Sequence, residues 1–357
     1  MEPLEQYGWT ADLDEAWKAL DQPDAQPGRV IADFGTSLKV ALPEIVTAEL
    51  SGKLAHYTDR QAIPKVGDWV VVKVSPNGHA TVESIVPRSS EIARKTAGNQ
   101  TTKQVIAANV DIAFVLLALD NDFSVDRLRR FLYQLSINDI RPVIVLNKED
   151  KVNDTTPYIN QLQSFHLPIL TMTAKEGKGV DELLSYIKPG NTAVLLGSSG
   201  VGKSTLTNYL LGREVQKTQE IRESDESGRH TTVHRELFML PNGGLLVDMP
   251  GIRELQLWGT EDDLDEQYAD IVMLSRQCQY TSCRHTTDAG CAIRPALEDG
   301  TLDMEHYEAF LKMKAELHSL AERKIVRAKR SNEKSKHTLK KQRRHESREY
   351  RNEIDEG

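Results

Sequence analysis

A phosphate-binding loop is the strongest chemical signal in the sequence. Residues 197–204 read Gly-Ser-Ser-Gly-Val-Gly-Lys-Ser and match the GxxxxGK[ST] pattern in full. An apolar run at 193–196 precedes them and a helical pattern at 205–211 follows, as this motif requires. In such a loop, backbone N–H groups surround phosphate oxygens, Lys203 reaches the β- and γ-phosphates, and Ser204 ligates Mg²⁺. The residues expected to contact nucleotide here are Gly197, Ser198, Ser199, Gly200, Val201, Gly202, Lys203, Ser204 and Thr205.

A second group of residues predicts which base is bound. Residues 147–150 read Asn-Lys-Glu-Asp after an apolar run at 143–146, and an NKxD segment after a strand is typical of guanine recognition. The Asp150 carboxylate can accept hydrogen bonds from guanine N1–H and from the exocyclic amine, which adenine does not offer. These letters alone also fit a turn with an Asx cap, but the phosphate loop favours the nucleotide interpretation. The expected base contacts are Asn147, Lys148 and Asp150, with Thr173, Ala174 and Lys175 as a second base-contacting loop after the run 169–172.

A third group is suited to sensing the γ-phosphate. Asp248-Met-Pro-Gly251 forms a DxxG segment after the apolar run 245–247. Asp248 would hold Mg²⁺ through water, and the Gly251 N–H would meet the γ-phosphate. The polar segment 228–232, Gly-Arg-His-Thr-Thr, fits a loop that orders with nucleotide, in which Thr231 or Thr232 completes the Mg²⁺ shell. The alternative for this segment is a plain surface loop.

The order of these motifs is itself informative. The guanine-reading segments precede the phosphate loop, the reverse of ordinary GTPases, and no second phosphate loop precedes Asn147. The sequence therefore predicts a circularly permuted GTPase domain, a rearrangement that proteins tolerate where the native termini lie close together. Permutation places the DxxG segment at the end of the domain, next to whatever follows.

The residue directly after the DxxG segment cannot orient the attacking water. Ordinary small GTPases place a water-orienting Gln directly after DxxG, but here that residue is Ile252. We therefore expect slow intrinsic hydrolysis and assign the catalytic roles to His230, Lys203 and Gly251. His230 would position water; the alternative is that it packs or contacts RNA, and Arg229 would then stabilise charge in the transition state.

The three cysteines form a candidate metal site. The pattern Cys278-x4-Cys283-x-His285-x5-Cys291 places four ligands within fourteen residues, and Cys₃His is a closed tetrahedral set for structural zinc. The alternatives are free core cysteines beside a surface histidine, or an iron–sulfur site. Because the three cysteines are an odd number and lie close together, a disulfide framework is a poor interpretation and a cytosolic thiol or metal site a better one.

The elements that must position these groups suggest a multidomain chain. Five short β-prone runs within 28–90 predict an OB-fold-like barrel, which either binds nucleic acid or only packs against its neighbour. Apolar runs that alternate with helical patterns predict an α/β GTPase domain over 91–259. An acidic extension with a peripheral helix and linker (1–27), a small, mostly helical zinc-binding domain (260–320) and a basic tail (321–357) complete the expected division.

Composition excludes some classes and points to a partner. The 357 residues are 39% hydrophobic and 27% charged, and the longest apolar run, 112–119, is too short to span a membrane. The N-terminus is acidic and lacks the apolar segment of a secretory signal. The tail 321–357 has 13 Lys and Arg against 7 Asp and Glu, so it carries +6 and the remainder −14 of the net −8. The tail is interpreted as a polyanion-binding extension or as a solvated charged helix.

The motif order resembles that of the RsgA/YjeQ family of circularly permuted bacterial GTPases. The resemblance covers about residues 28–320 and rests on NKED, TAK, GSSGVGKST, GRHTT, DMPG and C-x4-C-x-H-x5-C. It implies hydrolysis of GTP stimulated by the small ribosomal subunit, during late maturation or quality control of that subunit. It further implies rRNA contact through the barrel and the zinc domain, with GTP, Mg²⁺ and one structural Zn²⁺ bound.

Two other function classes remain open from the sequence. One is a GTP-gated RNA-binding module, in which hydrolysis only releases the protein. The other is a paralogue that acts on a different RNA or protein. In each case we expect a cytoplasmic monomer without membrane contact.

Overall fold

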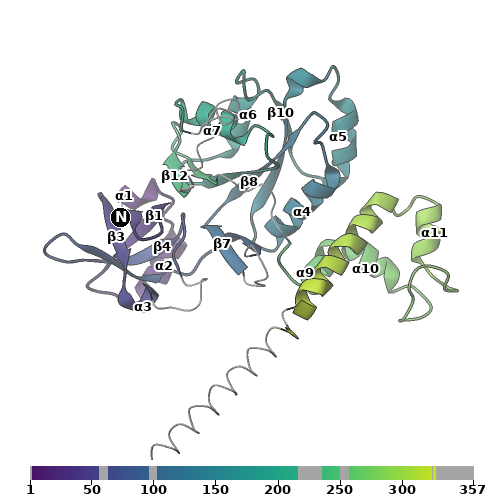
Figure 1. Cartoon of the computed structure of the whole chain (residues 1–357), viewed down its shortest axis with the longest axis horizontal. Helices are drawn as coiled ribbons and strands as arrows, with labels where there is room; N and C mark the ends of the chain where they lie inside the picture. The colour runs from purple at the N-terminus through teal and green to yellow at the C-terminus, as the bar shows by residue number, and fades with distance from the viewer. Residues whose placement is uncertain are drawn as a thin grey trace, which may run out of the picture. The chain divides into compact units, whose positions relative to one another are not determined.

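The computed structural model describes residues 2–55, 63–95, 103–215, 235–249, 257–323 and 325–326. Contacts among them form two compact units, which meet in the sequence at Trp258 and Gly259 (Figure 1). The finer division into five segments at 27, 90, 259 and 320 stays a prediction.

A closed five-stranded barrel begins the first unit, as the sequence predicts. The strands follow the order β1-β2-β3-β5-β4, and β4 returns to pair with β1. Only β3 and β5 pair in parallel. The side chains of Val30, Val40, Val70 and Val82 are fully buried inside the barrel. The barrel elements are β1 (Gln26–Asp33), β2 (Leu38–Ala41), β3 (Ile45–Leu50), α3 (Gly52–Ala55), β4 (Trp69–Val74) and β5 (Ala80–Ile85).

The N-terminal segment packs closely on this barrel. It forms α1 (Glu2–Glu5) and α2 (Ala11–Ala19). The Trp9 side chain is 6% exposed and meets the Trp69 ring edge-on, with ring centroids 4.8 Å apart. Its indole Nε1–H donates to Asp14 at 2.7 Å. The segment is therefore more than the peripheral helix and linker expected from its acidic composition, and β1 already starts within the expected linker.

A parallel sheet with helices on both faces forms the rest of the first unit. Its order is β10-β9-β8-β11-β13-β12, in which only β12 runs antiparallel to its neighbour. Along β8, Val115 and Leu117 enter one core, and Phe114 and Leu116 enter the other. The elements are β8 (Ile112–Ala118), α4 (Val125–Ser136), β9 (Arg141–Asn147), α5 (Thr156–Leu162), β10 (Ile169–Met172), α6 (Val180–Tyr186), β11 (Thr192–Leu196), α7 (Lys203–Leu211), β12 (Arg235–Met239) and β13 (Leu245–Asp248).

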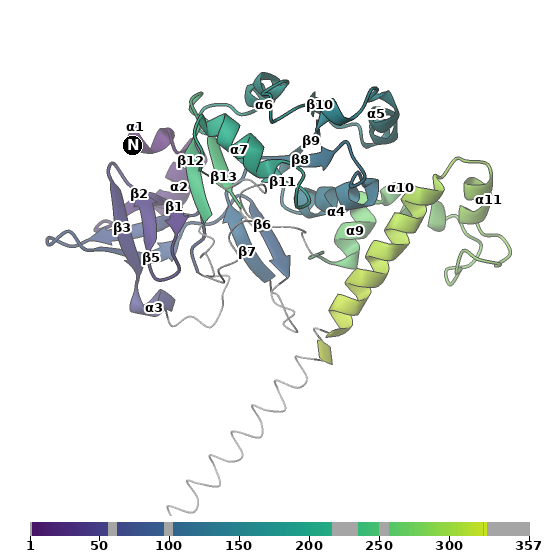
Figure 2. The same cartoon turned by 45° about the horizontal axis from the view of Figure 1, so that its top comes forward.

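Strands β1 and β12 join the barrel to this sheet (Figure 2). Ala32 pairs with Glu236, so one hydrogen-bonded sheet runs through both folds. Beside the junction, the buried Arg29 guanidinium donates to Thr192 Oγ1 at 2.8 Å, to the Asn109 carbonyl at 3.0 Å and to the Tyr7 carbonyl. Burial lowers the pKa of Arg29 to about 10. This side chain ties the N-terminal segment, the barrel and the parallel sheet together.

A hairpin that the sequence did not predict follows the barrel. It consists of β6 (Glu91–Lys95) and β7 (Lys103–Ala108), which pair antiparallel. Arg88 connects it to the barrel, because its guanidinium contacts Asp68 at 2.7 Å and Glu91 at 2.9 Å.

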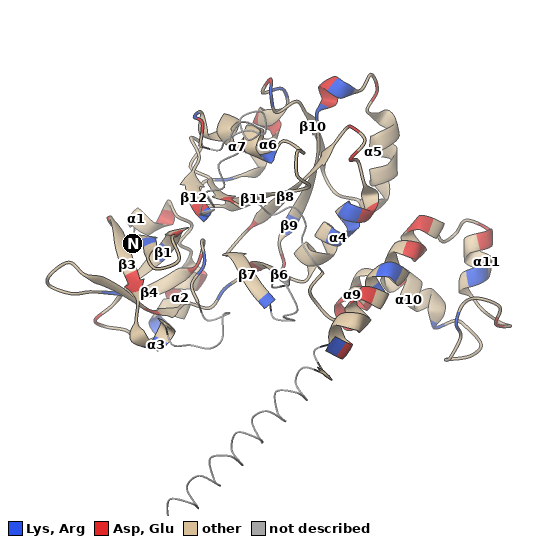
Figure 3. Cartoon of the chain, viewed as in Figure 1, with Lys and Arg blue, Asp and Glu red and all other residues tan. Residues whose placement is uncertain are grey.

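The second unit is helical in its regular parts. It contains α9 (Glu261–Gln267), α10 (Ala269–Ser275), α11 (Ile293–Glu298) and a helix over 304–323, in agreement with the mostly helical domain expected from the sequence. Tyr268 is buried, stacks on His306 and contacts Met313. Acidic residues are concentrated on α9 (Figure 3). This helix pairs with the long helix, since Lys314 Nζ lies 2.8 Å from Asp265. None of the described helices is long and apolar enough to cross a membrane.

Candidate functional site

Three of the predicted motifs lie at one edge of the parallel sheet. The phosphate loop follows β11, the NKED segment follows β9, and the TAK segment follows β10. These strands are parallel and belong to the run β10-β9-β8-β11. Ligands of open α/β sheets bind outside the carboxyl ends of the strands. The sheet therefore gathers segments that lie up to about 50 residues apart in the chain.

The phosphate loop needs glycine at two tightly packed positions. Gly202 has φ +105°, and a Cβ there would lie 2.2 Å from Asn147 Nδ2. Gly197 has φ +145°, and a Cβ there would lie 2.6 Å from the Leu116 carbonyl oxygen. Only glycine adopts these angles and leaves this space. Val201 is buried, whereas Ser199 and Gly200 are exposed at the tip.

Lys203 begins α7 and folds back over the loop. Its ammonium donates to the carbonyls of Gly197 at 2.7 Å and Ser198 at 2.6 Å. Burial lowers the pKa of Lys203 to about 8, and the charge of Asp122 opposes this shift. Ser204 and Thr205 follow in the same first helical turn, partly exposed. The ammonium thus already lies within the loop that would receive the phosphates.

Asn147 ties the three loops together. It is 2% exposed, and its Nδ2 donates to the Val201 carbonyl of the phosphate loop at 2.8 Å. Its Oδ1 accepts from the Ala174 N–H of the TAK segment at 3.0 Å. An amide side chain carries both a donor and an acceptor, so one residue can hold both neighbours. The Asn147 amide therefore contacts both neighbouring loops, and its expected role at the base stays a prediction.

The other base-reading residues occupy the same two segments. Lys148 adopts a left-handed backbone and pairs with Asp120 at 2.7 Å. Asp150 lies in the short 3₁₀ helix η2 (Glu149–Lys151), and its carboxylate is 36% exposed. In the TAK segment, Thr173 is buried and Lys175 is exposed. The two segments are joined again by an ion pair between Lys178 and Glu149 at 3.0 Å.

Two acidic residues at this edge escaped the sequence analysis. Asp120 and Asp122 lie between β8 and α4, beside the NKED segment and the phosphate loop. The Ser198 hydroxyl donates to Asp122, whose pKa is lowered mainly by its hydrogen bonds from Arg127. The Lys148 contact lowers the pKa of Asp120, although partial burial opposes it. The sequence did contain a signal for these two residues, because paired carboxylates directly follow a buried apolar run.

The γ-phosphate motifs are only partly described. Asp248 ends β13, which pairs with β11, so it lies at the same edge as the phosphate loop. The remaining residues predicted for this part lie outside the described residues: Arg229, His230, Thr231, Thr232, Gly251 and Ile252.

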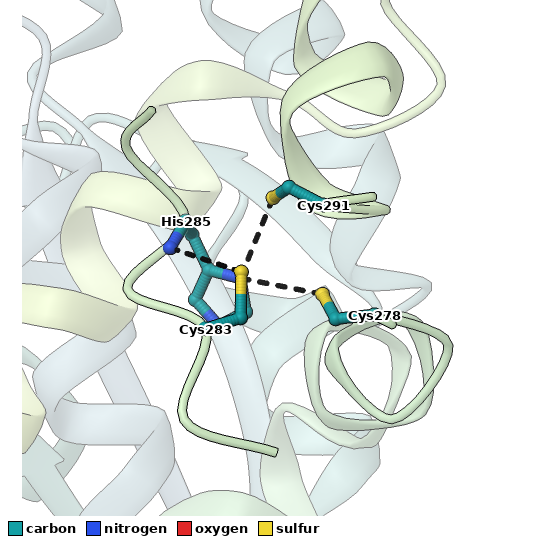
Figure 4. A group of neighbouring side chains, drawn as sticks. All are labelled: Cys278, Cys283, His285 and Cys291. Atoms are coloured by element: carbon teal, nitrogen blue, oxygen red, sulfur yellow. Dashed lines mark hydrogen bonds between the residues drawn. The ribbon is translucent and has the colours of Figure 1, made fainter. Parts of the chain in front are cut away.

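In the second unit, the four predicted metal ligands converge (Figure 4). One ligand atom from each of Cys278, Cys283, His285 and Cys291 lies within 4.8 Å of the others. His285 Nδ1 is 3.5 Å from Cys278 Sγ and 3.6 Å from Cys291 Sγ. Tetrahedral zinc bonded to sulfur and nitrogen places them about 3.5–3.6 Å apart. The donor set and its spacing therefore fit a structural zinc ion.

Backbone groups orient the sulfur ligands. The Ala292 N–H donates to Cys278 Sγ at 3.3 Å, and the His285 N–H donates to Cys283 Sγ at 3.4 Å. Such contacts around the ligands stabilise thiolates and fix their direction. The four ligands come from one continuous stretch of 14 residues.

Together, the barrel, the permuted motif order and the nucleotide-type site define a circularly permuted P-loop GTPase. The chain belongs to the RsgA GTPase family. The family model described as RsgA GTPase matches residues 85–258. The small ribosomal subunit biogenesis GTPase RsgA of Syntrophotalea carbinolica is 40% identical over 329 residues, 88% of this chain and 90% of that protein. The protein of the same description from Opitutus terrae is 37% identical over 88% of this chain and 89% of its own length.

Solved structures agree with this assignment. YjeQ from Thermotoga maritima aligns with a TM-score of 0.61 and 25% identity, covering 82% of this chain and 98% of that chain. YloQ, described as a circularly permuted GTPase, aligns with a TM-score of 0.57 and 22% identity over 84% of this chain and 97% of its own. The second likeness shows the shared fold.

Proposed function

We propose that this chain is a GTPase that acts in the biogenesis of the small ribosomal subunit. The single observation that carries the nucleotide assignment is the buried Asn147 amide, which joins the phosphate loop to the TAK segment. The cellular role rests on the relatives, which are named for small ribosomal subunit biogenesis and align over most of the chain.

In this proposal, GTP lies across the sheet edge, with its phosphates in the loop 197–205 and its base at the NKED and TAK segments. Lys203 leaves its carbonyl partners for the β- and γ-phosphates, and Asp150 accepts the guanine N–H groups. Ser204, Asp248 and Thr231 or Thr232 would hold Mg²⁺. The ion would neutralise charge on the phosphate oxygens.

Hydrolysis in this proposal uses His230 to position water, because Ile252 cannot. The Gly251 N–H contacts the γ-phosphate, and Lys203 stabilises charge that develops during transfer. In the second unit, Cys278, Cys283, His285 and Cys291 would hold one structural Zn²⁺. The sequence and the donor geometry support these assignments.

The proposed partner is the small ribosomal subunit, including its rRNA. The barrel and the zinc domain would supply the contacts, and the basic tail 321–357 is a further candidate, since a net charge of +6 attracts polyanions. We propose a cytoplasmic monomer.

The test is GTP turnover by the purified chain, alone and with isolated small ribosomal subunits. We expect strong stimulation by the subunits, lost in Lys203→Ala and reduced in His230→Ala. Intact GTP binding without stimulation would assign the chain to a different partner. Undiminished stimulated turnover in His230→Ala would reject that residue's role.

A second candidate function is a GTP-gated RNA-binding module. The pairing of β1 with β12 favours it, because β12 begins three residues after Thr232 and so connects the predicted switch segment directly to the barrel. A hydrolysis-deficient variant that still binds GTP distinguishes the two. If it supports subunit maturation, the gated module is correct; if it blocks maturation, hydrolysis is the required step.

A further inference from the structure

The loop between β8 and α4 contacts both halves of the nucleotide site. Asp120 Oδ2 accepts from Lys148 Nζ of the NKED segment at 2.7 Å. Asp120 Oδ1 accepts from the Asp122 N–H at 2.9 Å, which fixes the turn between the two acids. The Asp122 carboxylate then accepts the hydroxyl hydrogen bond of Ser198 in the phosphate loop. One short turn therefore connects the base-reading segment to the phosphate loop.

Arg127 holds the carboxylate of Asp122 as well. The guanidinium of Arg127 donates to Oδ2 at 2.8 Å and to Oδ1 at 3.0 Å, and also to the Asp122 carbonyl at 3.2 Å. Arg127 lies in the first turn of α4, which Ser124 caps at its N-terminus and whose Leu128 is fully buried. A bidentate arginine–carboxylate pair fixes orientation as well as distance. The carboxylate therefore has a defined position relative to the core.

The direction of the contact with Ser198 follows from charge. The hydrogen bonds from Arg127 hold the pKa of Asp122 below its usual range, so the carboxylate is ionised at neutral pH and only accepts. The Ser198 hydroxyl must then donate. Ser198 is 9% exposed, and its carbonyl is one of the two that hold Lys203. Fixing Ser198 therefore fixes the start of the loop whose N–H groups would surround the phosphates.

We propose that Asp122 is a positioning residue for nucleotide binding, which holds the phosphate loop in one conformation through the Ser198 hydroxyl. The inference rests on the proposed nucleotide site and adds a residue outside the recognised motifs. Asp122 acts through Ser198 and does not itself contact the phosphates. Its effect is expected on the affinity for GDP and GTP.

A double-mutant cycle tests this role. Fluorescent GDP is titrated into the wild-type protein, Asp122→Ala, Ser198→Ala and the double variant. We expect each single variant to raise the Kd for GDP about 3- to 10-fold. This is the effect of losing one hydrogen bond to a charged group when only part of its energy contributes to ligand binding. The double variant should bind no more weakly than the weaker single variant. Asp122→Asn should recover part of the loss, because its amide oxygen still accepts.

Several outcomes would overturn the proposal. Additive effects of the two substitutions would mean that Asp122 does not act through Ser198. Unchanged affinity in Asp122→Ala would remove the role altogether. Tighter binding in that variant would show that the carboxylate mainly repels phosphate. If Asp122→Ala does not fold, the cycle is run with Asp122→Asn and Ser198→Ala, where coupling is still expected but smaller, and additivity would again overturn the proposal.

Two controls separate this inference from the proposed function. Asp126→Ala removes a carboxylate four residues further along, in the first turn of α4. Asp126 is 57% exposed and lies 3.6 Å from Arg129. The GDP affinity of this variant should match that of the wild type. Equal weakening in Asp126→Ala would indicate a general charge effect. Lys203→Ala tests the site itself. If Lys203→Ala loses GDP binding while Asp122→Ala keeps it, only the positioning role of Asp122 is wrong. If Lys203→Ala binds GDP normally, the proposed nucleotide site itself is wrong.

Discussion

The nucleotide site and the metal site are held together in different ways. At the nucleotide site, loops are fixed by the buried Asn147 amide and by fully buried strands such as β8 and β11. At the metal site, residues 276–290 are all at least partly exposed, and of the four converging ligands Cys291 alone is buried. The comparison teaches that buried contacts of the fold prepare the first site in advance, whereas the second would depend on the zinc ion proposed for it.

Removing the metal should produce the largest effect. Structural zinc contributes about 10 kcal/mol or more of apparent folding energy in small domains, so chelation should unfold the segment 276–292. The first unit has its own core and should keep its GDP affinity within about twofold. Hydrogen exchange of residues 276–292, with a GDP titration on the same sample, measures both. Retained protection in protein shown to be free of metal would contradict the comparison.

Gly202→Ala should break the preformed site. The added Cβ would lie 2.2 Å from Asn147 Nδ2 at φ +105°, so the loop and the amide must separate. We expect a loss of about 3–4 kcal/mol in the free energy of unfolding and of most GDP binding. Denaturant unfolding and GDP titration measure the two effects. Gly212→Ala, also at positive φ but with no atom within 4 Å of the added Cβ, is the matched control and should retain GDP binding.

Asn147→Asp should have a smaller effect, because it preserves the shape of the side chain. It loses the donor to the Val201 carbonyl and keeps the acceptor for the Ala174 N–H. We expect about 2–3 kcal/mol of destabilisation and about tenfold weaker GDP binding. Asn138→Asp, at a partly buried asparagine that donates to the Gln134 carbonyl, serves as control. Equal effects of the two substitutions would mean that Asn147 does not join the loops.

The pH dependence of GDP binding should be the mildest effect. Burial lowers the pKa of Lys203 to about 8, and phosphate favours the charged ammonium, so the bound form has the higher pKa. Affinity should be constant below about pH 7 and fall about tenfold between pH 7 and pH 9 as free Lys203 loses its proton. GDP titrations across this range give the profile. The same fall in Lys203→Met would assign the titration to another group.

The fold was predictable where local patterns carry the information. Five barrel strands appear as predicted, within 28–90 apart from the start of β1, and the strand before each nucleotide motif lies close to its predicted range, because alternation and buried apolar runs are local signals. The pairing of β1 with β12 was not predictable, because the sequence does not mark which distant strand completes a sheet edge. Trp9 was missed for a related reason. One buried aromatic residue in an acidic segment leaves no periodic pattern.

In the candidate sites too, local patterns were predictable and contacts between distant segments were not. The residue types and spacing of the phosphate loop and the Cys₃His set predict their ligands locally, because that chemistry needs a fixed order of groups. The contacts that hold the loops come from elsewhere in the chain, as with Asp122 and Ser198. The roles of His230, Thr231, Thr232 and Gly251 stay predictions.

The junction between β1 and β12 also affects how the chain is made. Ala32 pairs with Glu236, about 200 residues later in the sequence. At about 5–20 residues per second, roughly 10–40 seconds of synthesis separate the two strands. Throughout that interval the end of β1 is an open sheet edge, and such edges pair readily with other chains. The barrel closes through β1 and β4, but Ala32 and Asp33 gain their second partner only when β12 arrives, so a barrel produced alone would keep a short open edge at the end of β1.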